Sequence, residues 1–169
     1  MDATVKLYSF DYRDTRTFLV AALFIIGNIA LPQLCHLMPQ GGLIFLPIYF
    51  FTLIGAYKYG WKVGLLTAVL SPLVNSLLFG MPTAAVLPSI LVKSVLLAVS
   101  AGYVAHRFGK VNLLLLLAVV LFYQVVGSAF ESVMHGSFVK GFQDFRLGLP
   151  GMFVQVVGGY LFIKYLLKK

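Results

Sequence analysis

The sequence predicts an all-α membrane protein, a compact bundle of six transmembrane helices. The chain has 169 residues, of which 60% are hydrophobic and 11% charged, and its mean hydropathy is +0.96. Soluble domains have about 45–50% apolar and about 25% charged residues, so this composition does not fit a soluble fold. At about 20 residues per crossing, the length accommodates about six helices with short connections. Within these residues we therefore expect no separate soluble catalytic domain.

Six apolar stretches separated by turn-forming residues are the candidate spans, and together they make a single domain over 1–169. Their approximate ranges are 17–37, 43–60, 62–80, 83–106, 111–135 and 147–167. If all six cross the bilayer, one side of the membrane receives Lys6, Arg13, Arg16, Lys58, Lys62, Arg107, Lys110, Lys164, Lys168 and Lys169, and the other receives Lys140 and Arg146. Because positive residues favour the cytoplasmic side, both termini are predicted to be cytoplasmic.

The same distribution bears on possible partners. The net charge is +8, but the basic residues cluster at helix ends, where the lipid bilayer accounts for them. We therefore expect no nucleic-acid partner. Cys35 is the single cysteine, which rules out an intramolecular disulfide.

Polar side chains inside the spans are the candidates for a site, because a lysine at a helix centre costs about 2.5–3.5 kcal/mol on insertion scales. Lys93 lies near the middle of span 83–106. In span 111–135, residues at i, i+3, i+4, i+7 and i+11 share one helix face. They are Gln124, Gly127, Ser128, Glu131 and His135. The predicted direction of each span places Lys93, Glu131 and His135 in the outer half of the bilayer.

Asn28 in the first span and Gln155 in the sixth are expected somewhat deeper, where they can converge with these groups on an outward-facing chamber. The candidate substrate-binding residues are therefore Lys93, Asn28, Ser128, Glu131, His135 and Gln155. Two interpretations remain open: a ligand site, or an internal salt bridge between Lys93 and Glu131 that binds nothing. An unpaired Lys93 favours a carboxylate or phosphate on the ligand, and this preference disappears if Glu131 neutralises it.

Catalytic and metal-binding signatures are missing from the sequence. It contains no G-x-S-x-G, H-E-x-x-H or P-loop motif, so we expect neither enzymatic activity nor a cofactor. His36 and His135 have no third ligand at a suitable spacing, and no metal site is predicted.

A family resemblance comes from residues 45–109. This run contains an L-P pair opening the second span, a G-W-K-x-G junction, an S-P-L-x-N segment, a G-x-P turn and a helix rich in small residues that ends in basic ones. In these features the chain resembles the S components of energy-coupling-factor (ECF) transporters, which bind substrate for ATP-driven importers.

The resemblance implies a protein of the bacterial or archaeal cytoplasmic membrane that captures a vitamin or related micronutrient in an outward-facing chamber. It implies delivery by toppling against a membrane T component that works with two cytoplasmic ATPases. It also implies a lid loop containing His36, Gln40 and Gly41. The family's A-x-x-x-A contact with the T component has no strict match here. Its nearest equivalents are Thr17-x-x-x-Ala21 and Ala22-x-x-x-Ile26.

A second interpretation belongs to a different functional class. A non-transporting membrane scaffold, similar to the MreD family of the bacterial cell-elongation machinery, has a similar size and number of spans. It predicts helices packed without a ligand chamber. Lys93 and the polar face of span 111–135 favour the binding subunit.

Overall fold

The computed structural model describes residues 5–167, except for the side chain of Asp144. These residues form helices and turns, with no strand among them. Five helical segments are long and apolar enough to cross a membrane. They are α1 (Thr15–Cys35), α4 (Trp61–Phe79), α5 (Leu87–Phe108), α6 (Leu113–His135) and the C-terminal run Leu149–Leu166. The chain is therefore a multi-pass α-helical membrane protein.

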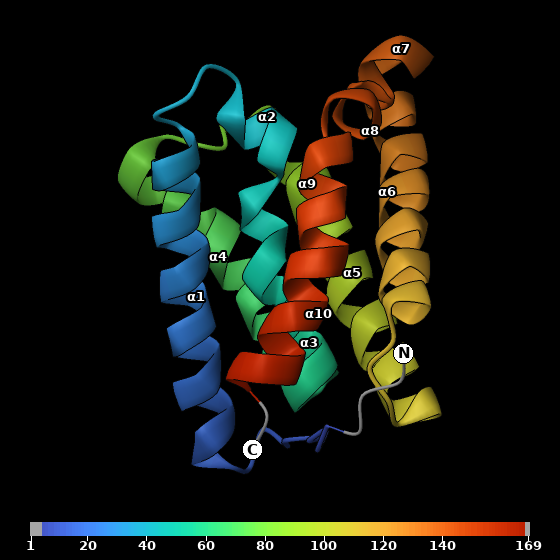
Figure 1. Ribbon diagram of the computed structural model, residues 1–169. Coiled ribbons are helices and arrows are strands. Elements are labelled where there is room, and N and C mark those ends of the chain that lie inside the picture. Colours follow the sequence, from blue (N-terminus) through green and yellow to red (C-terminus); the bar gives the residue numbers. More distant parts are fainter. Residues whose placement is uncertain (1–4, 168–169) are drawn as a thin grey trace.

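The C-terminal run changes its hydrogen-bonding pattern along its length. It consists of α9 (Leu149–Phe153), the π-type turn η2 (Val154–Gly158), α10 (Gly159–Leu161) and the π-type turn η3 (Phe162–Leu166). These pieces follow one another along a single axis in Figure 1. The predicted span 147–167 therefore forms a helix with wider turns inserted.

The second apolar stretch differs from the continuous helix predicted over 43–60. It forms α2 (Gly41–Phe45), the 3₁₀ turn η1 (Pro47–Tyr49) and α3 (Phe50–Tyr59). The break falls at Leu46, which has left-handed backbone angles of φ 47° and ψ 46°. Pro47 explains the break, because its ring disfavours the helical conformation of the preceding residue and it has no N–H to donate. In Figure 1, α2 lies at the end of the bundle where α1 finishes, and α3 leads to the end where α4 begins.

Close backbone contacts join the central helices. A Cβ added to Gly64 of α4 would collide with Ala56 of α3, and one added to Gly102 of α5 would lie 2.5 Å from Cβ of Trp61. Helices within a membrane pack most closely where small residues meet. These two glycines therefore hold α3, α4 and α5 together.

Helix α6, which carries the predicted polar face, has well-defined ends. The side chain of Asn112 accepts a 2.8 Å hydrogen bond from the N–H of Leu114 and so caps the first turn. The helix ends at Gly136, whose φ of 59° is accessible to glycine at little cost. Glu131 and His135 consequently lie in the last two turns of α6.

The N-terminal segment, residues 5–14, crosses the end of the bundle where α3 finishes (Figure 1). The N–H of Tyr8 donates to the carbonyl of Lys58 at 2.8 Å, and the N–H of Phe10 donates to the carbonyl of Tyr59 at 3.0 Å. The buried ammonium of Lys58 donates in turn to the carbonyl of Lys6 at 2.5 Å. The segment thereby satisfies carbonyls at the end of α3 that have no partner within the helix.

An ion pair joins the same segment to α4, and its contribution to stability should depend on pH. Lys62 Nζ lies 2.5 Å from Asp11 Oδ2, and the hydrogen bond from Lys62, helped by the backbone N–H of Arg13, lowers the pKa of Asp11 below 3.8. A lowered folded-state pKa stabilises the protein above the unfolded-state pKa, and this stabilisation is lost as the pH falls through the folded-state pKa. Asp11→Asn should therefore lower the melting temperature slightly at pH 7, because the pair is exposed.

Thermal unfolding in detergent from pH 7 to pH 3 measures this effect. The difference between wild type and Asp11→Asn should shrink as the pH falls below 4, and also as salt is added at pH 7. A difference that grows on acidification would contradict this assignment of the pair.

Candidate functional site

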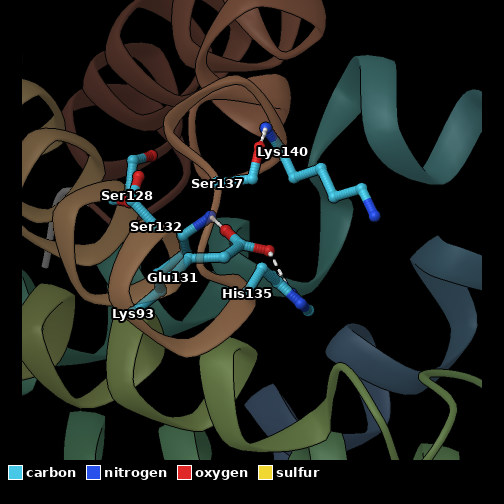
Figure 2. Close-up of polar contacts among 7 residues, drawn as sticks. All are labelled: Lys93, Ser128, Glu131, Ser132, His135, Ser137 and Lys140. Carbon is cyan, nitrogen blue, oxygen red and sulfur yellow. Dashed lines mark hydrogen bonds and ion pairs between the residues drawn. The ribbon is translucent and has the colours of Figure 1, made fainter.

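A buried ion pair joins α5 to α6. Lys93 is fully buried, and its Nζ lies 2.5 Å from Oε2 of Glu131, whose side chain is 10% exposed. His135 Nε2 lies 3.8 Å from the other carboxylate oxygen. Figure 2 shows Lys93 and His135 reaching the carboxylate of Glu131 through different oxygens. Of the predicted site residues, these three are brought together.

The stem of Lys93 reaches the carboxylate by passing over a glycine. A Cβ added to Gly127 would collide with Cγ of Lys93 and would lie 3.3 Å from its Cδ and Cε. Gly127 therefore belongs to the polar face of α6 for a steric reason. It leaves room for the lysine stem to run along the helix toward Glu131.

Several polar groups on these two helices are buried without a hydrogen bond inside the described part of the chain. They are the hydroxyls of Ser89, Ser94 and Ser128 and both amide atoms of Gln124. An unsatisfied buried donor or acceptor costs about 1–3 kcal/mol. Ser128 was a predicted site residue, whereas Gln124 and the two α5 serines were not. Gln124 precedes Ser128 by four residues, and Ser89 precedes Lys93 by four. Each pair therefore shares a helix face, and this spacing could have identified Gln124 and Ser89 from the sequence.

The last turns of α6 are covered by short helices. α7 (Phe138–Gly141) and α8 (Gln143–Leu147) lie beside the end of α6 in Figure 1. A Cβ added to Gly141 would collide with Ser132, and the hydroxyl of Ser132 donates to the carbonyl of Ser128 at 2.8 Å. Two further residues of this covering segment, Ser137 and Lys140, are drawn with the ion pair in Figure 2.

Asn28 belongs to a different polar network, at the junction of α1, α3 and α4. Its Nδ2 donates to the hydroxyls of Thr52 at 2.9 Å and Ser71 at 3.1 Å. Its Oδ1 accepts the N–H of Phe51 at 3.1 Å. Nδ2 of Asn75 donates to the Asn28 carbonyl at 2.9 Å. The amide of Asn28 is thus engaged in joining three helices.

Gln155 is also engaged within the chain. Its Oε1 accepts the hydroxyl of Tyr123 at 2.9 Å, and its Nε2 donates to the carbonyl of Leu46 at 3.5 Å. A Cβ added to Gly151, one turn earlier, would collide with the backbone of Phe45. Gln155 therefore links α6 and the C-terminal run to the break in the second apolar stretch.

The predicted lid loop forms a turn between α1 and α2. His36 caps the C-terminus of α1, and its ring lies against Gly42, since a Cβ there would be 2.9 Å from Nε2. Gln40 has a left-handed φ of 56°, and Gly41 is the buried first residue of α2. The turn covers 36–40, because α1 ends at Cys35 and 41–45 is helical.

The predicted T-component contact on α1 is mostly covered by the chain itself. Thr17 is fully buried, and its hydroxyl donates to the carbonyl of Asp11 at 2.5 Å. Ala21 is 2% exposed, whereas Ala22 lies on the exposed face. Of these three residues, Ala22 is the one presented to a neighbour.

Within residues 5–167, apart from Asp144, no group of three or more His, Cys, Asp or Glu side chains could hold a metal ion. The α5 and α6 site instead contains a neutralised ion pair, with buried hydroxyl and amide groups on the same two helices. Comparison of the chain with family models, with curated proteins and with solved structures finds no match.

Proposed function

We propose that the chain is the substrate-binding subunit of an ECF-type importer, which captures a small vitamin-like solute between α5 and α6. The observation that carries this proposal is the set of buried polar atoms without partners beside the Lys93–Glu131 pair. Such atoms destabilise an empty helix interface, and a bound polar ligand would satisfy them. The resemblance of 45–109 to S components supports the same role.

The chemistry of these groups favours a neutral ligand. Lys93 is paired with a carboxylate, so the site offers no surplus positive charge to an anion. The amide of Gln124 presents a donor and an acceptor side by side, and the hydroxyl of Ser128 can act as either. A ring that carries an amide-like donor and acceptor pair matches Gln124. We therefore propose a neutral, heterocyclic solute.

Access requires a movement at one end of the bundle. Lys93, Gln124 and Ser128 are fully buried, so a ligand can reach them when a covering segment shifts. Figure 1 places α2 at the same end as α7 and α8, and these elements are the proposed gate. In this proposal that end faces outward, α2 to α3 forms the second of six crossings, and both termini are cytoplasmic.

Energy for uptake is assigned to partners. The sequence contains no P-loop, so ATP hydrolysis belongs to other subunits. By resemblance these are a membrane T component and two cytoplasmic ATPases in a bacterial or archaeal cytoplasmic membrane. Exposed Ala22 and its neighbours on α1 offer the available part of the proposed docking surface.

The decisive variant is Gln124→Leu, which removes two unpartnered buried atoms at nearly constant volume. The ligand-free variant should be more stable than wild type by about 1–3 kcal/mol, while its affinity for ligand should fall at least about tenfold. Equilibrium unfolding in mixed micelles measures the first effect. Calorimetry and thermal shift against a panel of neutral and anionic vitamins measure the second.

The matched control is Ser100→Ala, because the half-buried hydroxyl of Ser100 donates within its own helix to the carbonyl of Leu97. It should leave ligand affinity unchanged. If no panel member raises the melting temperature of the wild type, or if Gln124→Leu binds as tightly as wild type, the site does not bind the proposed ligand.

The second candidate function is the non-transporting scaffold, which the closed ion pair favours because both charges are satisfied without a ligand. A scaffold predicts that Gln124→Leu gains stability and that no vitamin binds to either form. Affinity purification separates the two functions. An importer subunit should co-purify with a T component and ATPases, and a scaffold should co-purify with other morphogenetic membrane proteins.

A further inference from the structure

A groove of about 580 Å³ lies between the N-terminal segment, the start of α4 and the second half of α5. Its floor forms where Gly102 of α5 meets the backbone of Trp61, since a Cβ on Gly102 would lie 2.7 Å from Cα of Trp61. Leu7, Tyr8 and Ser9 form the wall supplied by the N-terminal segment. The groove is thus at the opposite end of α5 from Ser89 and Lys93.

One side of the groove faces outward from the bundle. Val99 and Tyr103 line it and are 47% and 65% exposed, and both belong to a helix that is long and apolar enough to span a membrane. Exposed apolar surface on such a helix meets acyl chains. Trp61, 43% exposed, and Tyr103 place aromatic rings at its edge, as is usual near the boundary between lipid tails and headgroups.

An arginine lies next to the other end of the groove. His106 lines it, and Arg107 is exposed in the last turn of α5, between the lining residues His106 and Gly109. Cations at a helix C-terminus are favoured by the helix dipole and remain available to an anion. Within the described residues this end of the bundle carries Lys6, Arg13, Arg16, Lys58, Lys62, Arg107, Lys110 and Lys164 against Asp11 and Asp14. The surplus of positive charge attracts anionic headgroups.

We infer that this groove binds one anionic phospholipid. An acyl chain lies along Val99, Gly102 and Tyr103, and the phosphate meets the ring N–H of His106 and the guanidinium of Arg107. The apolar, outward-facing side and Arg107 lie along one helix, which matches the amphipathic shape of a lipid. This site is separate from the α5 and α6 polar cluster and does not depend on vitamin binding.

Native mass spectrometry with added lipid tests the inference directly. Phosphatidylglycerol should be retained as one bound molecule and should raise the melting temperature more than phosphatidylcholine with the same chains. Arg107→Gln should weaken phosphatidylglycerol binding by about fivefold, the effect of one basic charge near an anionic headgroup. Val99→Trp, which fills the outward side, should abolish retention of the lipid.

The matched control is Lys140→Gln, which removes an exposed cation at the other end of the bundle and should leave lipid binding unchanged. Equal retention of both lipids would overturn the inference, as would an equal loss in Lys140→Gln. Inorganic phosphate or glycerol phosphate alone stabilising the protein as much as the lipid would also overturn it, because an anion site without an acyl chain would then suffice. Arg107 is exposed, so its substitution tests the site even if Val99→Trp fails to fold.

Discussion

Replacing Lys93 with methionine is expected to lower the free energy of unfolding by about 3–5 kcal/mol, because it leaves Glu131 buried without its partner. The double variant Lys93→Met, Glu131→Leu should recover most of this loss, since a buried ion pair can be exchanged for apolar residues at little net cost. Equilibrium unfolding in mixed micelles gives the free energy of each variant. The coupling energy of the pair follows from the double-mutant cycle.

Lys140→Met is the control, because this lysine is exposed and its loss should change stability by about 0.5 kcal/mol or less. If the double variant loses as much as the two single variants together, the side chains are not coupled. The double variant also separates structure from function. A folded double variant that no longer binds solute would place the ion pair in the binding site, whereas unchanged binding would restrict it to structure.

Replacing Asn28 with alanine is expected to destabilise the protein by about 2–4 kcal/mol. The substitution removes three hydrogen bonds and leaves the N–H of Phe51 without its acceptor, and each unsatisfied buried group costs about 1–3 kcal/mol. Affinity for solute should stay within about twofold of wild type, because the Asn28 amide is directed to Thr52 and Ser71. Unfolding and calorimetry measure the two quantities separately.

Gln33→Ala provides the comparison on the same helix. Gln33 is half-buried and donates one long hydrogen bond, 3.4 Å, to Asn75, so its loss should cost about 1 kcal/mol or less. A tenfold loss of solute affinity in Asn28→Ala, with stability preserved, would contradict the structural role and return Asn28 to the binding site.

The meeting of Lys93 with Glu131 could be predicted because both are charged residues inside apolar spans. A charge in hydrocarbon needs a partner, and span direction placed the two at the same depth. The helix face containing Ser128 and Glu131 follows from the 3.6-residue period alone. These parts of the site depend on the depth of a residue in the bilayer and on helical periodicity, and both can be inferred from the sequence.

The neighbours of Asn28 and Gln155 could not be predicted in the same way. Depth does not say which helices touch. The partners of Asn28 come from α3 and α4, whereas those of Gln155 come from α6 and from Leu46, between α2 and η1. The break at Leu46 did have a local signal, because Pro47 disfavours helix at the residue before it. The continuous hydrophobicity of 43–60 nevertheless favoured a single uninterrupted span.

Leu46 has a mechanical consequence. A continuous helix transmits a push or a twist from one end to the other, whereas α2 and α3 are joined through a left-handed residue at which the hydrogen-bond ladder stops. Gln155 donates a hydrogen bond to the carbonyl of Leu46, and Gly64 allows close packing of α3 against α4. The two parts of this stretch therefore have different anchors: Phe45 at the end of α2 packs against Gly151 of α9, whereas α3 packs against α4.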